Sequence, residues 1–364
     1  MINKSINTAY SKIYKTHKEK VDASNESYDK IFKYMKNLDK LFKKKYSDFD
    51  STEYFTILKD KQHKTEFAYS TSIYIDNFCL PAIINLAYSI KYHCNSKYDL
   101  ICFVQNKSYY EKNYLNNTYK KINGLSHSDI ETIKELFDIV IDVNITKLFS
   151  KKDSVYDKLF YYILYDSLYP YAYTKYKKIL YLGNNSIINK NIDFLFDKYD
   201  KSTYGLDYLT KEYKGGLYYN VILYIPRNYY IKKIEYILKN YDIIFKNLFF
   251  IVPKMANVIY YTIFPDWSEQ RFEFDLINYN FERIPYINSK PTSYNIDCYI
   301  DDYYAIYTPF NFHNLYKDIP ERNKFNLNNK NFKKWDLLVI ELLKKFPKYS
   351  KFFDFIKTYR NTLF

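Results

Sequence analysis

The spacing of apolar positions divides the chain into three parts, and the first part is basic and helical in pattern. Residues 1–65 are rich in lysine, and their apolar side chains recur near the helical period of about 3.6 residues. The positions on this apolar stripe are Ile31, Phe32, Tyr34, Met35, Leu38, Leu41 and Phe42. We expect this part to be a helical extension that packs on the following domain. An arm that binds a protein partner is the alternative.

The second part, residues 66–320, alternates short apolar runs with helical stretches. The runs expected to form strands are 67–75, 98–105, 138–144, 177–184, 201–208 and 215–226. The stretches expected to form helices are 80–93, 128–137, 156–169 and 229–250. Ser128, three residues before Glu131, suggests a capping box. Repeated β-α-β units of this length predict an α/β domain with a mostly parallel sheet and helices on both faces.

The third part, residues 321–364, combines an amphipathic helix with a concentrated positive charge. The stretch 331–346 places an apolar stripe on one helical face with lysines around it. The residues of this stripe are Trp335, Leu338, Val339, Leu342 and Leu343. Eleven Lys or Arg against four Asp or Glu make this part carry half of the net charge of +14. We expect a helix packed on the domain, and binding to an anionic membrane surface is the alternative.

The composition weakens aromatic residues as evidence of function. The chain holds 47 Tyr and 28 Phe but only 5 Gly. Because Lys, Asn, Ile, Tyr and Phe all have AT-rich codons, nucleotide bias in the source genome explains much of this excess. Such a genome suits a large DNA virus or an intracellular parasite. Basic and aromatic side chains together would also suit a protein that binds single-stranded nucleic acid, which is an alternative function class.

The cysteines and the apolar runs predict a reduced, cytoplasmic protein. Cys79, Cys94, Cys102 and Cys298 form no Cys-x-x-Cys pair, and no His lies at ligand spacing to them, so no zinc site is expected. No N-terminal apolar stretch and no run of about 18 apolar residues occurs, so we expect neither a signal peptide nor a membrane span. If the source is viral, the compartment would be the host cytoplasm.

The stretch YLGNNSIINKNIDFLF, residues 181–196, carries the most specific signal. It begins like the end of a buried strand, ends like the first turn of a helix, and places Gly183, Asn184 and Asn185 at the corner between them. Together with 73–93, 156–199 and 215–230, it resembles in order and spacing glycosyltransferase family 8, typified by glycogenin and galactinol synthase. The resemblance covers about two thirds of the chain, and its most specific part is NKNIDFLF.

The resemblance implies a single-domain fold of the GT-A type and a nucleotide-sugar donor at the carboxyl ends of the strands. In that family a divalent metal, usually manganese, is held by carboxylates and stabilises the diphosphate leaving group. At the nucleotide end the match holds. Thr71 corresponds to a strand residue near the base, Asp76 to the polar position beside it, and Phe78 to an aromatic that stacks on uracil. Lys158 matches a lysine used near the donor.

At the metal end the resemblance fails. Gly183 and Asn185 stand where the family has the two acids of Asp-x-Asp. Three further segments also differ from the family pattern. On the acceptor and sugar side, Asn220 follows two tyrosines where the family has Asn-Ser-Gly, and Asn257 stands in place of Asp-Gln-Gly. The stretch 306–312 corresponds to a distal segment but lacks its His and Lys. No metal cofactor is therefore expected, and manganese would bind only if this alignment of the corner is wrong.

Two functions compete on this basis. The first is a glycosyltransferase fold that has lost metal-dependent catalysis and serves as a binding or scaffold protein, with a UDP-sugar as its ligand. The second is an active transferase that uses a UDP-sugar without metal, in which lysines replace the cation electrostatically. Lys158 is the first candidate for that role, with Lys190 and Lys214 beside it.

Overall fold

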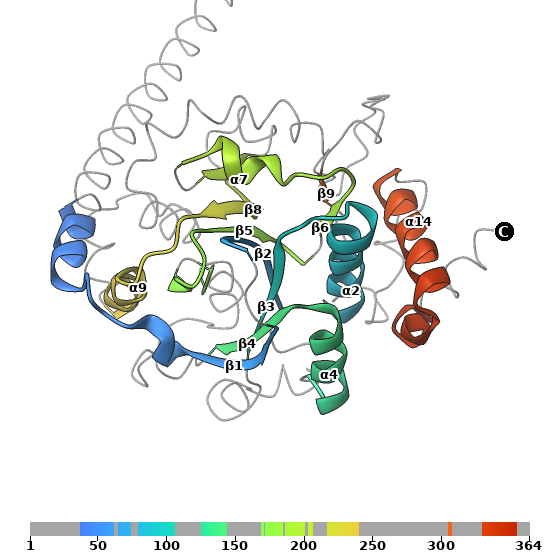
Figure 1. Cartoon of the computed structure of the whole chain (residues 1–364), viewed down its shortest axis with the longest axis horizontal. Coiled ribbons are helices and arrows are strands. Elements are labelled where there is room, and N and C mark those ends of the chain that lie inside the picture. Colours follow the sequence, from blue (N-terminus) through green and yellow to red (C-terminus); the bar gives the residue numbers. More distant parts are fainter. Residues whose placement is uncertain are drawn as a thin grey trace, which may run out of the picture.

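The computed structural model shows a mixed α/β architecture. It describes residues 37–61, 65–73, 79–105, 125–143, 169–170, 172–184, 186–200, 203–206, 217–239, 305–307 and 330–354. Within these residues, a seven-stranded sheet runs through the molecule with helices packed against it, and a second sheet has two strands (Figure 1). The α/β class predicted from the alternating pattern is confirmed.

The elements have the following bounds. The large sheet contains β1 (Phe55–Asp60), β2 (Phe67–Ile73), β3 (Asp99–Gln105), β4 (Ile139–Val143), β5 (Lys178–Leu182), β7 (Thr203–Leu206) and β8 (Leu217–Tyr224), and the small sheet contains β6 (Ser186–Ile188) and β9 (Ala305–Tyr307). The helices are α2 (Leu80–Tyr88) with its π-helical continuation η3 (Ser89–His93), α4 (His127–Leu136), α7 (Phe194–Lys198), α9 (Tyr230–Lys239) and α14 (Lys330–Lys345). Short 3₁₀ helices are η1 (Ser51–Tyr54) and η8 (Pro347–Phe353), and residues 37–45 are helical.

The strand order creates a switch point at the centre of the large sheet. The order is β1-β4-β3-β2-β5-β8-β7, in which β4, β3, β2 and β5 are parallel while β1, β8 and β7 run antiparallel to their neighbours. After β2 the chain builds β3 and β4 on one side and then returns to place β5 on the other side. The carboxyl ends of β2 and β5 therefore flank the position where open α/β sheets bind ligands.

Strand β1 extends the sheet into the part of the chain that the sequence assigned to a helical extension. Phe55 lies opposite Val143 and Asp60 opposite Ile139 on β4, so that β1 is the edge strand of the sheet. Phe55 is buried with the rings of Phe103 and Tyr173, which explains why this short, partly charged segment is a strand. A strand also protects the hydrogen-bonding edge of β4 from water and from other chains.

The two faces of the sheet bury different side chains. Alternate strand residues such as Tyr69 and Leu100 pack beneath α2, α4 and α14, on the right of Figure 1. Their neighbours Ala68 and Ile101 pack on the opposite face with Ile231 of α9. The same face also buries Tyr169, Ala172, Tyr173 and Tyr176. This division follows from the two-residue period of a strand, and it yields the sheet covered on both faces that the sequence predicted.

The capping box of α4 lies two residues before the predicted one. Ser126 is the N-cap residue, and its hydroxyl accepts a hydrogen bond from Asp129 N at 3.1 Å while Asp129 Oδ2 accepts one from Ser126 N at 2.8 Å. Ser128 instead lies inside the helix, where its carbonyl accepts a hydrogen bond from the Thr132 hydroxyl at 2.9 Å. Ser126 and Asp129 have the three-residue spacing of a capping box, because Asp, like Glu, can accept a hydrogen bond from the N-cap amide.

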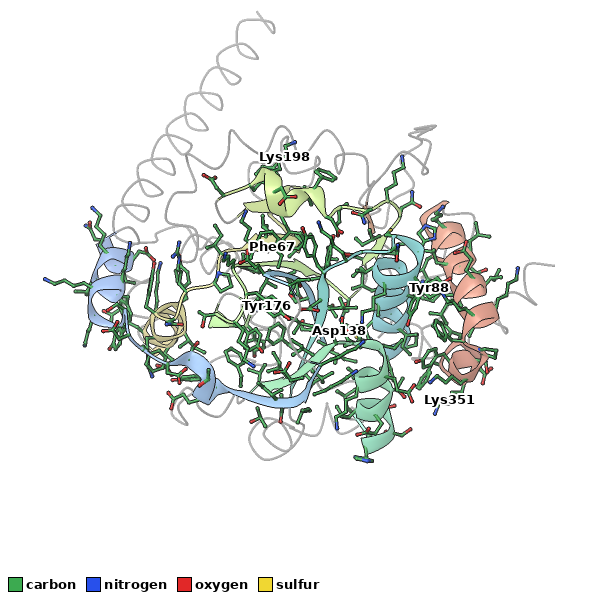
Figure 2. All side chains as sticks on the ribbon, viewed as in Figure 1. Phe67, Tyr88, Asp138, Tyr176, Lys198 and Lys351 are labelled. Atoms are coloured by element: carbon green, nitrogen blue, oxygen red, sulfur yellow. The ribbon has the colours of Figure 1, made fainter. Side chains whose placement is uncertain are left out.

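The described part of the basic tail, 330–354, packs on the core of the domain, as the sequence predicted. Trp335, Leu338, Val339 and Leu342 on α14 are at most 1% exposed and belong to the core beneath α2. Tyr88 of α2 lies toward α14 in Figure 2, and its ring centroid is 6.5 Å from that of Phe346. The apolar face that could have met a membrane is therefore covered by α2. Among the described residues, no helix combines the length and apolar composition needed to cross a membrane.

Candidate functional site

Three positions singled out from the sequence meet at the switch point. Ser70 of β2 lies opposite Tyr181 of β5, so the next residue, Thr71, is level with Leu182. Leu182 is in turn opposite Val221 of β8, so that Gly183 and Asn220 each lie one residue beyond this pair. Thr71, Gly183 and Asn220 therefore occupy neighbouring backbone positions on three adjacent strands, beyond the carboxyl end of β5.

The remaining predicted site residues lie outside the described part of the chain. They are Asp76, Phe78, Lys158, Asn185 and Asn257, together with the alternative lysine Lys214. Asp76 and Phe78 belong to the segment that connects the end of β2 to the start of α2, and β2 ends at the switch point. Lys190, the other alternative lysine, follows β6 and is exposed. The roles of these residues stay predictions.

Three consecutive hydroxyl residues lie near the carboxyl end of β2, with Thr71 on the face covered by α2 and Ser70 and Ser72 on the opposite face. Ser70, Thr71 and Ser72 are 0% exposed, although central parallel strands are usually apolar. The hydroxyls of Ser70 and Thr71 have no hydrogen-bond partner, whereas the Ser72 and Tyr181 hydroxyls are 2.9 Å apart. A buried hydroxyl without a partner is unfavourable, so these two hydroxyls are candidates for contact with a ligand or a bound water. In the sequence, the run Ser-Thr-Ser inside a predicted buried strand could have indicated these buried hydroxyls.

The corner after β5 has a backbone that does not require glycine. Ser186 N donates a hydrogen bond to Gly183 O at 2.9 Å, which reverses the chain between β5 and β6. Gly183 does not have a positive φ, so a residue with a Cβ could adopt the same backbone conformation. The missing side chain at this position is therefore not imposed by the turn.

The described part of the corner does not fit a divalent metal held by carboxylates. Gly183 has no side chain and Asn184 offers only a neutral amide. Across the described residues, no three or more His, Cys, Asp or Glu side chains are grouped so that they could hold a metal ion. Hard cations such as Mg²⁺ and Ca²⁺ prefer charged oxygen ligands, and the two described corner residues, Gly183 and Asn184, supply none.

The distal segment identified from the resemblance lies beside the corner. In the small sheet, Tyr307 of β9 is opposite Ser186 of β6, and Ala305 is opposite Ile188. Residues 306 and 307 thus contact the strand that leaves the corner, although they are far away in sequence. The rest of that segment, 308–312, lies outside the described residues.

The side chains of the motif NKNIDFLF make contacts that hold the fold together. Asp193 accepts hydrogen bonds from the Tyr69 hydroxyl at 2.7 Å and the Ser96 hydroxyl at 2.6 Å. Asn191 accepts one from Asp193 N at 2.8 Å, and Ile192 is 1% exposed. The acid in this motif is thus engaged in joining β6 and α7 to the sheet. Sequence reasoning recognised the motif but did not identify these partners.

Burial keeps two reactive groups near this motif protonated at neutral pH. Burial, and then the hydrogen bond to Asp193, raise the pKa of Tyr69 well above its usual value. Burial, with a smaller effect of Asp193, raises the pKa of Cys94 to about 12. Since the thiolate is the nucleophilic form of cysteine, Cys94 is a poor candidate for a catalytic role. Tyr69 serves as a hydrogen-bond donor.

Comparisons with known proteins find distant structural similarity. No protein-family model and no curated protein matches the chain. Among solved structures, the galactosyltransferase LgtC in complex with donor and acceptor sugar analogues is 12% identical, with 53% of this chain and 69% of LgtC covered and a TM-score of 0.34. An active-site mutant of LgtC is 10% identical, with 75% and 95% covered and a TM-score of 0.41.

The glycosyltransferase GlyE of Streptococcus pneumoniae TIGR4 is 13% identical, with 78% of this chain covered and a TM-score of 0.39. The chain spans 64% of GlyE, slightly less than two thirds of its length. All these TM-scores are below 0.5. The function proposed below therefore rests on the topology and residues of this chain.

Proposed function

We propose that this chain binds a nucleotide sugar in a site of the glycosyltransferase type and has lost metal-dependent transfer, so that it acts as a binding or scaffold protein. The observation that carries the proposal is the position of the carboxylate-free corner at the switch point. Gly183 follows β5 there, level with Asn220 of β8 and one residue beyond the position that is level with Thr71 of β2. This is the edge where α/β sheets of this topology bind ligands.

The residues at this edge suit a nucleotide better than a metal-bound diphosphate. Phe78 would stack on the base and Asp76 would bond the nucleoside, because both belong to the segment between β2 and α2. The Thr71 hydroxyl has a free hydrogen-bonding capacity at the base of that segment. For the diphosphate, the amide of Asn184 contributes far less than a carboxylate to holding a hard cation, so lysines such as Lys158 or Lys190 would supply the positive charge.

Calorimetric titration with UDP and UDP-glucose, with and without manganese, tests the proposal. We expect binding whose dissociation constant changes by less than about twofold with manganese, because no carboxylate site links the metal to the ligand. A donor-hydrolysis assay on the same samples should show no turnover. Lys158→Ala should weaken UDP binding if this lysine supplies positive charge to the diphosphate, as the resemblance suggests.

The other outcomes separate the alternatives. Turnover that survives EDTA and disappears in Lys158→Ala would establish the metal-independent transferase. Turnover that requires manganese would show that the acids lie elsewhere and that the corner is aligned wrongly. Binding to a generic oligonucleotide that weakens with salt, without any binding of UDP, would identify a nucleic-acid-binding protein instead.

A further inference from the structure

The strand that leaves the corner is held by side chains as well as by β9. Ile188 N donates a hydrogen bond to the Ser89 hydroxyl at 3.0 Å, and Ile188 O lies 3.5 Å from Cys94 Sγ, which donates to it. Ser89 is 0% exposed, and its hydroxyl donates to Leu86 O at 2.7 Å. Because Ser89 opens the π-helical end of α2, this end of the helix is bound directly to β6.

The residues after β6 continue the same set of contacts. Asn191 Nδ2 donates to Cys94 O at 3.1 Å. The Asp193 carboxylate accepts from the Tyr69 hydroxyl at 2.7 Å, the Ser96 hydroxyl at 2.6 Å and Lys97 N at 3.4 Å. We call the six side chains that make these bonds the β6 clamp. They are Tyr69, Ser89, Cys94, Ser96, Asn191 and Asp193.

The clamp secures an unusual turn at the end of the helix. Asn95 has a φ of 50°, in the left-handed region that asparagine tolerates better than most residues. This turn directs the donors of Ser96 and Lys97 toward one carboxylate, that of Asp193. Hydrogen bonds to a charged acceptor are stronger than those between neutral groups. One acid therefore joins β2, the turn at 94–97 and the segment that follows β6.

The clamp reaches the candidate site from two sides. Tyr69 lies two residues before Thr71, and strand alternation places both side chains on the face covered by α2. On the other side, Ile188 lies two residues after Ser186, whose N–H is bonded to Gly183 O. A shift of β6 would therefore be transmitted to the corner through a short, extended segment.

We propose that Tyr69 and Asp193 are positioning residues for the nucleotide-sugar site. Their hydrogen bond fixes the corner at 183–185 relative to the end of β2, so that the two strand ends at the switch point keep the separation that a ligand requires. The ligand in this inference is that of the proposed function. The inference that the clamp holds the corner in place depends only on the hydrogen bonds of the clamp.

The test compares Tyr69→Phe with Tyr176→Phe. Each variant removes one buried hydroxyl that donates to a carboxylate: Tyr69 to Asp193 at 2.7 Å, and Tyr176 to Asp99 at 3.0 Å. Tyr176 packs in the core on the face of the sheet opposite to Tyr69, so the sheet separates the control bond from the clamp. We expect both variants to lower the melting temperature. Only Tyr69→Phe should speed amide exchange at 183–188 and weaken UDP binding, each by about tenfold.

A second variant, Asn191→Ala, alters an exposed side chain of the clamp and should accelerate exchange at 183–188 in the same way. If the wild type does not bind UDP, the proposed function fails, and the exchange rates still decide whether the clamp holds the corner. If the wild type binds UDP but Tyr69→Phe and Tyr176→Phe change exchange and affinity equally, the positioning role is refuted while the proposed function stands.

Discussion

Trp335→Ala is expected to lower the free energy of unfolding by about 3–5 kcal/mol. The indole is 1% exposed, packs in the core beneath α2, and has its ring centroid 6.0 Å from that of Phe353. Truncation would remove buried apolar surface and leave a cavity that the surrounding helices can fill only in part. The hydrogen bond from Asn85 Nδ2 to the Trp335 carbonyl, at 3.2 Å, involves the main chain and would survive. Urea denaturation followed by circular dichroism measures the change.

Leu337→Ala provides the matched control on the same helix. Leu337 is 54% exposed, so its truncation should change the stability by less than about 0.5 kcal/mol. Equal stability of the wild type and Trp335→Ala would mean that α14 does not pack on α2. Vesicles of anionic lipid give a further test of the tail. If the protein binds them and loses binding when the exposed Lys344 and Lys345 are both replaced by Gln, α14 has a second role on its lysine-rich side.

The buried strands were predictable because parallel strands covered on both faces are usually apolar along most of their length. The observed strands β2, β3, β4 and β5 lie within the predicted runs 67–75, 98–105, 138–144 and 177–184, in that order. Their ends differ from the predicted ones by at most two residues. Strand β1 was missed because an edge strand needs few apolar residues. Phe55 is buried, while Lys59 and Asp60 follow in the same strand. The pairing of β6 with β9 joins segments far apart in sequence, which no local pattern reveals.

The candidate site was predictable as a set of positions but not as a set of contacts. Thr71, Gly183 and Asn220 could be chosen from their places at the ends of predicted strands, and the sheet register brings them together. The bond between Tyr69 and Asp193 could not be foreseen, because nothing local distinguishes one tyrosine among 47. Long-range hydrogen bonds depend on the fold, and in a tyrosine-rich chain residue type carries little information about them.

The other large effect is expected at the contact between residues 37–45 and α9. Lys233 Nζ lies 2.6 Å from Asp39 Oδ1, the lysine side chain is 1% exposed and that of the aspartate 18%. The rings of Phe42 and Tyr236 lie beside this pair of helices, with centroids 5.4 Å apart. Asp39→Ala should lower the free energy of unfolding by about 3–5 kcal/mol, because the buried ammonium would lose its carboxylate partner.

Adding Lys233→Met should recover part of that loss. The methionine fills similar space without a charge, so the double variant should be more stable than Asp39→Ala alone. Asp48→Ala, at an exposed position of the same N-terminal segment, is the control and should change stability by less than about 0.5 kcal/mol. If Asp39→Ala behaves like this control, residues 37–45 are a dispensable extension. The expected loss would instead make them part of the folded domain, since α9 follows β8 and contributes Ile231 to the core behind the sheet.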